Sequence, residues 1–202
     1  MDVKSLYTNI PNDEGVEAVK SYLYYLETRN LTPVISAFLT LILTLNNFQF
    51  NDENILQING VSMGTKCAPQ YANLFMGKFE ESHILPKIKD IILLYCRFID
   101  DIFFIWTGSE EELVIVTNAF NDLHPNIKFE VQYSKERIDF LDTTVIITKE
   151  NTIETTIYRK PTDHKAYLHS KSYHPRTTKE AIPYSQALRI KRICSDRTDC
   201  QS

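Results

Sequence analysis

Apolar residues recur at helical spacing early in the chain. The positions concerned are Val16, Val19, Leu23 and Leu26. This spacing predicts a helix that Asn12 or Asp13 can cap. A second helix is predicted from Thr32 to about Leu45, because Pro33 then lies in the first helical turn, where its missing N–H costs nothing.

Other apolar stretches predict strands. Residues 127–133 alternate apolar and polar side chains, so one face of that strand is expected to be buried and the other wet. Residues 92–106 are almost continuously apolar, which predicts a buried hairpin. The remaining predicted strands are residues 2–10 as a short strand and turn, 48–51 with 55–58 as a hairpin, and 138–147 with 153–159 as a strand pair.

Two further helices complete the predicted order. One begins near Ala68-Pro69, and the other is opened by Ser109 and Glu112, which together form a capping box. The succession of strand, helices, hairpin, helix, strand and hairpin predicts an α+β fold with an antiparallel sheet and helices on one face. A split β-α-β polymerase palm of the ferredoxin-like type would give this order, and so would many other folds.

Composition places the chain among ordinary globular proteins. Apolar residues make up 43% and charged residues 24% of its 202 residues. No signal peptide follows Met1, and the most apolar stretch, residues 33–45, is too short to span a bilayer. We therefore expect an intracellular protein of the nucleus or cytoplasm, neither secreted nor bound to membrane. The four cysteines form no C-x-x-C pair, although Cys194 and Cys200 could belong to a metal site that continues beyond the chain.

Charge is distributed unevenly along the chain. The net charge is −4, yet residues 159–192 contain nine Lys or Arg against two Asp or Glu, a local balance of +7. Residues 1–158 have a balance of −10. An acidic body followed by a basic segment fits a carboxylate metal site beside a surface that binds phosphate. The alternative is a solvated basic face.

Two adjacent acids interrupt the apolar hairpin. Asp100 and Asp101 follow Phe98-Ile99 within a stretch that is otherwise mostly apolar or aromatic. Unpaired carboxylates are costly to bury, so these acids must lie at a wet turn, pair with a cation or bind metal. A plain Asp-Asp turn is the alternative, since turns favour Asp.

Two other segments gain meaning beside this pair. Asp2 begins the first predicted strand, with Tyr7 five residues later. Residues 60–75 form a loop with two glycines that leads into a helix, and such a loop lets backbone approach a ligand closely. Taken separately, each segment has a simpler interpretation. Asp2 would be an exposed acid near the N-terminus, and the loop would lead into the helix without binding a ligand.

Taken in order, these segments resemble the motifs of reverse transcriptases. Asp2 with Tyr7 resembles motif A, residues 62–75 resemble motif B, and Phe98-Ile99-Asp100-Asp101 resembles motif C. Lys135 falls where a motif D lysine could lie, and residues 139–142 resemble motif E. The amino-acid sequences of four segments are most similar to those of Penelope-like retroelements: residues 2–11, 62–76, 158–163 and 184–190. The resemblance implies a palm over residues 1–160 and the basic start of a thumb over 161–202.

That resemblance implies an RNA-directed DNA polymerase acting on an RNA template, a DNA primer and deoxynucleoside triphosphates. Its cofactor would be two Mg²⁺ ions, with Mn²⁺ as the alternative. Such ions lie about 4 Å apart and clamp the attacking and leaving oxygens. The implied metal ligands are Asp2, Asp100 and Asp101. The other implied roles are nucleotide binding for Tyr7, Met63 and Gly64, leaving-group protonation for Lys135, and primer or template binding for Phe140, Leu141, Arg159 and Lys160.

The chain departs from the family pattern in two respects. Met63 stands where many reverse transcriptases have Gln before the motif B glycine. The chain also begins at motif A, without the fingers that grip the triphosphate, and the C-terminal nuclease is not visible, so we expect a fragment with weak activity. A catalytically inactive nucleic-acid-binding remnant is the second hypothesis. A metal-dependent phosphatase or nuclease shares the carboxylates but does not explain the motif B loop.

Overall fold

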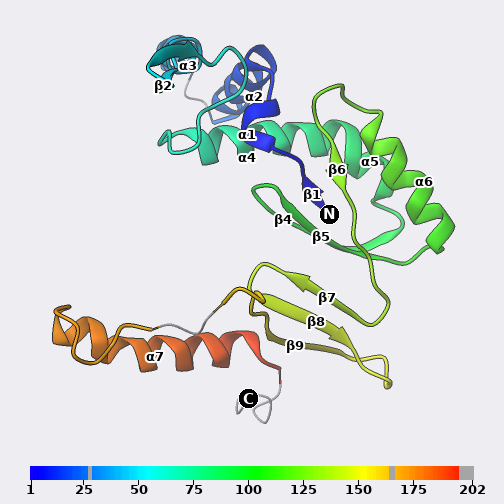
Figure 1. Cartoon of the computed structure of the whole chain (residues 1–202). Helices are drawn as coiled ribbons and strands as arrows, with labels where there is room; N and C mark the ends of the chain where they lie inside the picture. The colour runs from blue at the N-terminus through cyan, green and yellow to red at the C-terminus, as the bar shows by residue number, and fades with distance from the viewer. Residues whose placement is uncertain (27–28, 164–166, 196–202) are drawn as a thin grey trace. The chain divides into compact units, whose positions relative to one another are not determined.

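The computed structural model describes residues 1–26, 29–163 and 167–195, which form two compact units (Figure 1). The units are Met1–Val131 and Gln132–Ser202. This division is one of packing. The division into a palm over residues 1–160 and the start of a thumb over 161–202 was inferred from family motifs and stays a prediction.

The first unit combines a four-stranded antiparallel sheet, a separate hairpin and several helices. The sheet has the order β4-β5-β1-β6, and the hairpin is β2-β3. Its strands are β1 (Asp2–Val3), β2 (Asn47–Phe50), β3 (Glu53–Leu56), β4 (Ile92–Phe98), β5 (Asp101–Trp106) and β6 (Phe129–Glu130). Its helices are α1 (Leu6–Asn9), α2 (Asn12–Tyr25), α3 (Thr32–Thr44), α4 (Ala68–Phe79), the π-helical turn η1 (Glu80–Ile84), α5 (Leu85–Ile88) and α6 (Glu110–Asn121).

Alternation of side chains gives the four-stranded sheet one buried and one open face. Val3, Ile102 and Phe129 are buried, at 1%, 1% and 4% exposure. Their strand neighbours Asp2 and Glu130 are exposed. Because successive strand residues point to opposite faces, the acids lie on the face away from the core. The core is completed by side chains of α4 and α6, so helices cover the apolar face as predicted.

Two helices of the core approach each other closely at a glycine. Gly15 of α2 is buried against the ring of Tyr71 on α4, and a Cβ at residue 15 would lie 2.0 Å from the tyrosine oxygen. The contact allows α2 and α4 to pack side by side. The motif B helix is thereby fixed to the segment that follows β1.

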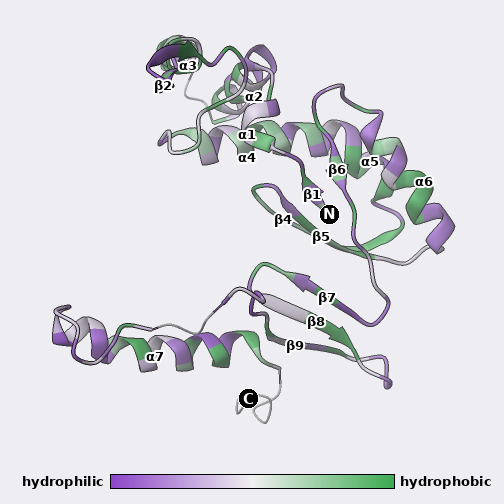
Figure 2. Ribbon diagram, in the orientation of Figure 1, coloured by the Kyte–Doolittle hydropathy of each residue, from purple (hydrophilic) through white to green (hydrophobic). Residues whose placement is uncertain are grey.

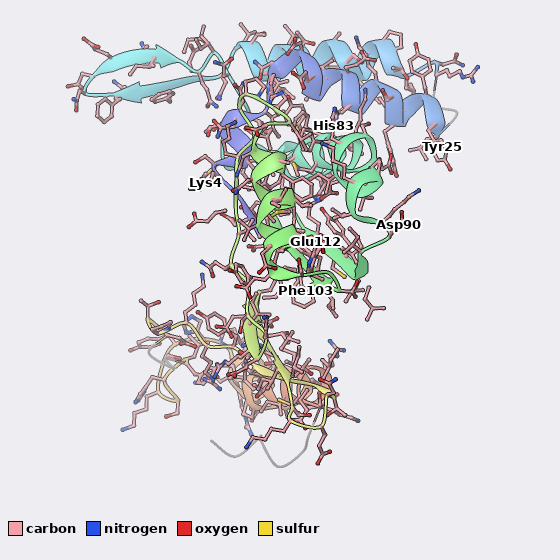
Figure 3. The ribbon with its side chains drawn as sticks, turned by 90° about the vertical axis from the view of Figure 1, so that its right-hand side faces the viewer. Lys4, Tyr25, His83, Asp90, Phe103 and Glu112 are labelled. Atoms are coloured by element: carbon pink, nitrogen blue, oxygen red, sulfur yellow. The ribbon has the colours of Figure 1, made fainter. Side chains whose placement is uncertain are left out.

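Helix α3 and the β2-β3 hairpin carry apolar side chains on their outer surfaces. Phe38 on α3 is 63% exposed, and Phe50 on β2 is 61% exposed. The side view shows the hairpin continuing away from α3 (Figure 3). Asn51 and Asp52 form its two-residue turn with positive φ values of 49° and 63°, which Asn and Asp tolerate better than other side chains.

The second unit contains one three-stranded antiparallel sheet and one long helix. The strands β7 (Arg137–Phe140), β8 (Thr143–Ile147) and β9 (Ile153–Ile157) are hydrogen-bonded in that order. The helix α7 (Arg176–Ile193) follows. Hydrophilic and hydrophobic residues alternate along α7 without a continuous apolar stripe (Figure 2), and none of its residues is buried. It is attached near its end, where the Ser195 N–H donates to the Thr155 carbonyl at 2.9 Å.

Several sequence predictions are confirmed. Helix α3 starts at Thr32 with Pro33 in its first turn. Ser109 and Glu112 form the reciprocal capping box of α6. The hairpins around residues 52 and 100 are both present, and α4 begins at Ala68. The strands of the first hairpin are Asn47–Phe50 and Glu53–Leu56 in place of the predicted 48–51 and 55–58.

Other predictions are wrong near the N-terminus. The short strand predicted at the start of residues 2–10 is confirmed as Asp2–Val3, but Ser5 then has a left-handed φ of 48° and the chain forms the unpredicted helix α1, which places Tyr7 on a helical turn. Asn12 does not cap α2. It is the first helical residue, and its side-chain amide donates to the Ile58 carbonyl at 3.2 Å.

The predicted strands also differ in burial and length. The hairpin of residues 92–106 is buried on one side only, since Leu93 is 73% exposed. Strand β6 contains only Phe129–Glu130, although Ile127 and Phe129 are buried as predicted. Residues 138–147 are not one strand, because Leu141 has a φ of 55° and the chain reverses there into β8. In the part of the chain that the structure describes, no helix is long and apolar enough to cross a membrane.

Candidate active site

The three acids of the predicted site lie on neighbouring segments of the four-stranded sheet. Asp2 of β1 is directly opposite Asp101 of β5 in antiparallel register. Residues paired in this way point their side chains to the same face. Asp100 belongs to the two-residue turn between β4 and β5, and its carbonyl accepts the Val3 N–H at 3.0 Å. The fold therefore places the backbones of the three acids side by side, although Asp2 is distant from the other two in sequence. Their shared binding of metal stays a prediction.

The electrostatics of Asp2 reflect this arrangement. Desolvation is the largest cause that raises the pKa of Asp2, followed by repulsion from Asp100 and Asp101 and, more weakly, from Glu130. The Met1 ammonium group lowers it. Asp2 is exposed, so solvent screens part of the repulsion. A nearby cation would oppose the repulsion among these carboxylates and lower the pKa of Asp2.

The donor set fits a divalent metal whose coordination is completed by other groups. Among residues 1–26, 29–163 and 167–195, no three His, Cys, Asp or Glu side chains lie close enough to form a ready-made metal site. Mg²⁺ characteristically takes one or two carboxylates and completes its shell with water and substrate phosphates. Asp2 and Asp100 can supply two such carboxylates, and Asp101 can act as a third ligand or orient the others.

The turn that presents Asp100 has an unusual backbone. Ile99 adopts a φ of 57°, in the left-handed region. For a β-branched residue this conformation is a true outlier and costs about 1–2 kcal/mol. Strain of this kind persists only where surrounding contacts determine the backbone.

The residues that surround this turn were not predicted from the sequence. Arg97 donates to the Ile99 carbonyl and to side chains of Asn73 and Glu80. Glu130 of β6 lies opposite Asp2 in antiparallel register, on the side of β1 away from Asp101. In the sequence, Arg97 is a charge inside an otherwise mostly apolar stretch, and its partners are fixed by tertiary structure.

Motif A and motif B meet through their backbones. The Val61 N–H donates to the Tyr7 carbonyl at 2.7 Å. Gly60 packs so closely there that a Cβ would lie 2.3 Å from the same carbonyl oxygen. Further along the loop, Met63 is 75% exposed, and Gly64 has no atom within 4 Å of its virtual Cβ. The structure thus joins Tyr7 to the start of the loop and leaves Met63 and Gly64 exposed.

The other predicted site residues belong to the second unit. Lys135 is exposed in the segment before β7, Phe140 ends β7, and Leu141 is in the β7-β8 turn. Arg159 and Lys160 are exposed after β9. Their roles toward primer, template or leaving group stay predictions.

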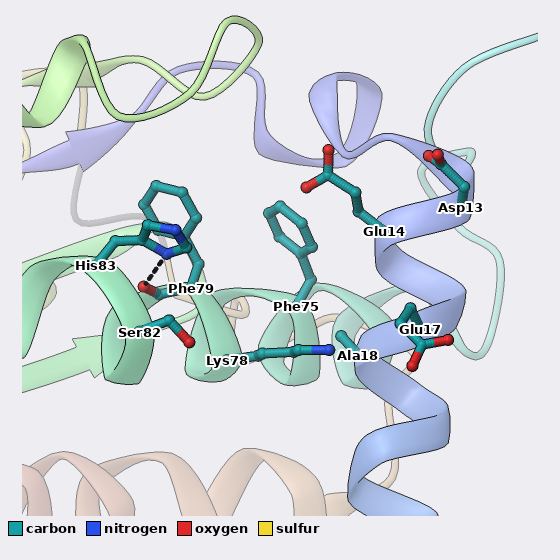
Figure 4. A pocket seen from close by; sticks show the side chains of 9 residues that line it. All are labelled: Asp13, Glu14, Glu17, Ala18, Phe75, Lys78, Phe79, Ser82 and His83. Atoms are coloured by element: carbon teal, nitrogen blue, oxygen red, sulfur yellow. Dashed lines mark hydrogen bonds between the residues drawn. The ribbon is translucent and has the colours of Figure 1, made fainter.

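A cavity of about 410 Å³ lies between α2 and α4 (Figure 4). Acidic side chains of α2 face Phe75 and Lys78 of α4 across it. The His83 ring stacks on Phe79, with ring centroids 4.9 Å apart. None of the predicted catalytic residues lines this cavity, so it is separate from the carboxylate site.

Comparison with known families agrees with the motif order. The family described as reverse transcriptase (RNA-dependent DNA polymerase) matches residues 1–162. An animal helix-turn-helix domain matches residues 166–201, of which the structure describes 167–195, including α7. No curated protein and no solved structure matches the chain significantly. Because the first match covers most of the chain and includes Asp2, Asp100 and Asp101, this chain belongs to the reverse transcriptase family.

Proposed function

We propose that the chain is the palm and the start of the thumb of a Penelope-like reverse transcriptase, which copies RNA into DNA by two-metal nucleotidyl transfer. The observation that carries the proposal is the pairing of Asp2 with Asp101 beside the turn that contains Asp100. Family membership implies a polymerase with nucleic-acid substrates. The Penelope-like assignment is supported by the amino-acid sequences of residues 2–11, 62–76, 158–163 and 184–190.

In the proposed reaction, the primer 3′-oxygen forms a bond to the α-phosphorus of a deoxynucleoside triphosphate. The bond to the bridging oxygen breaks, and pyrophosphate leaves. Asp2 and Asp100 would hold two Mg²⁺ ions, or Mn²⁺ in their place, with Asp101 in support. These ions would supply charge stabilisation at the attacking and leaving oxygens.

The remaining roles follow the family motifs. Tyr7 would lie under the deoxyribose and exclude a 2′-hydroxyl, while Met63 and Gly64 would line the nucleotide pocket. Lys135 would give a proton to the leaving pyrophosphate. Phe140 and Leu141 would support the primer, and the basic pair Arg159-Lys160 would contact primer or template phosphates.

The test is Mg²⁺-dependent extension of a labelled DNA primer on an RNA template by the purified chain, with EDTA as the control. We expect slow extension that requires the metal. The rate should be low because Lys66 is the cation that the motif B loop itself offers, and one exposed, flexible lysine is a weak clamp for a triphosphate. A folded chain that binds the primed template but never extends it would favour the inactive nucleic-acid-binding remnant instead.

A second proposed activity is binding of nucleic-acid backbone by residues 159–192. The local charge balance is +7, and no residue of α7 is buried. Tyr173 and Tyr184 are 108% and 69% exposed, so they are available to stack on bases. Similarity to a helix-turn-helix domain over residues 166–201 also supports this activity, since many such domains bind DNA.

Binding by this segment is expected to weaken steeply with salt. If about four phosphates of a single strand are neutralised, affinity should fall by about 50-fold between 50 and 200 mM salt. Fluorescence anisotropy with a mixed-sequence oligonucleotide measures this slope. Replacing Lys191 and Arg192 with Gln should make the slope shallower, whereas the same change at Lys87 and Lys89 of the first unit should leave it unchanged. A salt-independent affinity would contradict the proposal.

A further inference from the structure

Arg97 is an enclosed cation close to the candidate site. It lies on β4 two residues before Ile99, and its side chain is only 13% exposed. Its guanidinium donates from Nε to Glu80 Oε1 at 2.8 Å, and from one terminal nitrogen to Asn73 Oδ1 at 2.7 Å and to the Ile99 carbonyl at 3.1 Å. The other terminal nitrogen donates to the Asn73 carbonyl at 3.3 Å. One side chain thus joins the motif B helix, η1 and the turn before Asp100.

The partners of Arg97 are themselves fixed. The Glu80 side chain is 8% exposed and also accepts the Tyr95 hydroxyl at 2.7 Å. Burial raises the pKa of Tyr95, and the Glu80 carboxylate raises it further, so the tyrosine remains a proton donor to that carboxylate. Because the Glu80 carboxylate accepts from both Tyr95 and Arg97, the Arg97 guanidinium has little freedom to rotate. Its rigid, planar set of donors suits these four acceptor atoms, which lie in fixed directions on three residues.

The Ile99 turn needs such a support. Its left-handed φ of 57° is unfavourable for a β-branched residue, so the conformation must be imposed by contacts. The Arg97 bond to the Ile99 carbonyl acts on the peptide group that leads into Asp100. On the far side of that residue, the Asp100 carbonyl accepts the Val3 N–H at 3.0 Å. The backbone around Asp100 is therefore held from β4 and from β1.

We infer that Arg97 is a positioning residue, which holds the strained turn so that Asp100 stays in register with the strand that carries Asp2. Its effect on catalysis rests on the proposed polymerase function, whereas its effect on the turn does not. A buried ion pair gives little net stability on its own, because desolvation offsets the attraction between the charges. The Arg97–Glu80 ion pair alone would indicate only a structural role. The additional hydrogen bond from Arg97 to the Ile99 carbonyl is the observation that indicates a positioning role.

Amide hydrogen exchange measured by NMR tests the positioning directly. The Val3 N–H bonds to Asp100, whereas the next amide, Lys4, bonds to the Lys128 carbonyl at 2.8 Å and serves as the internal control. Arg97→Lys keeps the charge beside Glu80 but cannot reach all four acceptor atoms. We expect exchange at Val3 to accelerate at least tenfold in this variant while exchange at Lys4 changes less than twofold.

Two further variants separate the bonds. Glu80→Gln keeps an acceptor for Arg97 and the bond to Ile99, so Val3 exchange should stay close to wild type even if the protein is less stable. Arg97→Met removes every bond and should exceed Arg97→Lys in its effect on Val3. Equal acceleration at Val3 and Lys4, or an effect of Glu80→Gln as large as that of Arg97→Lys, would overturn the inference.

Kinetics then connect the turn to the reaction. In Arg97→Lys, kcat for primer extension should fall at least 30-fold, while KM for the nucleotide changes less than threefold, because the nucleotide pocket is left intact. An unchanged kcat would overturn the catalytic part of the inference. A wild-type chain that shows no metal-dependent extension would contradict the proposed function, and the exchange data would still decide whether Arg97 holds the turn.

Discussion

Replacing Asp100 with Asn is expected to lower the rate of Mg²⁺-dependent primer extension by about a thousandfold, equivalent to about 4 kcal/mol of transition-state stabilisation. The substitution removes the negative charge that would hold a divalent ion, while the amide keeps the size of the side chain. Asp100 is part of a turn and partly exposed, so the fold should tolerate the change. Single-turnover extension on an RNA template measures the loss.

The same substitution should not destabilise the protein. Repulsion from Asp100 is the second cause, after desolvation, that raises the pKa of Asp2. With that charge removed, the pKa of Asp2 should fall toward its ordinary value, and the ionised site becomes less unfavourable at neutral pH. We therefore expect a melting temperature equal to wild type or slightly higher, together with a smaller stabilisation by Mg²⁺.

Asp90→Asn is the matched control, because it removes the same charge from an exposed position of the same unit. It should leave the extension rate and the Mg²⁺ effect on melting unchanged. If Asp100→Asn and Asp90→Asn extend primers equally well, the carboxylate site is not the catalytic site.

The features that were predictable from sequence are those fixed by neighbours along the chain. The Ser109–Glu112 capping box depends on a three-residue spacing, and both of its bonds are present. The hairpin around Asp100 was evident because an apolar stretch is broken at one point, and β4 and β5 flank that point. In both cases residues close together in sequence determine the local backbone structure, so these elements can be predicted without knowledge of the tertiary contacts.

The errors occur where distant contacts compete with a local pattern. Asn12 has the chemistry of a helix cap, yet its side chain donates to Ile58, which lies 46 residues away in sequence. Alternation over residues 127–133 predicted a long strand, but β1 contains only Asp2–Val3 and offers a partner to just Phe129–Glu130. A strand needs a neighbour as well as a pattern, and the length of that neighbour cannot be read from the strand itself.

The candidate site shows the same division. Asp2, Asp100 and Asp101 could be named because their residue types and order match family motifs. The register of Asp2 opposite Asp101 depends on strand pairing across almost a hundred residues. Arg97 could be noted as a charge in an apolar stretch, but its partners Asn73 and Glu80 lie on segments that sequence alone does not place beside it.

Substitution of Gly60 with Ala is expected to destabilise the first unit by about 3 kcal/mol or more, whereas Gly64→Ala should cost about 1–2 kcal/mol. Both glycines have positive φ values, 71° and 95°, so both variants carry backbone strain. Only Gly60 is also enclosed. A Cβ there would lie 2.3 Å from the Tyr7 carbonyl oxygen and 2.6 Å from the Thr8 Cα, and backbone atoms cannot rotate away as a side chain can.

The difference between these two variants isolates the contact that joins motif A to motif B. Urea unfolding followed by fluorescence of Trp106, the only tryptophan, reports on the first unit alone, which avoids treating a chain of two units as one transition. If Gly60→Ala displaces the Tyr7 backbone, it should also weaken discrimination against ribonucleotides, since that discrimination is proposed to depend on where Tyr7 lies. Gly64→Ala leaves the Gly60 contact in place and should keep that discrimination while it narrows the open part of the loop. Equal losses of stability in the two variants would mean that strain alone, and not the close packing against Tyr7, determines the cost at residue 60.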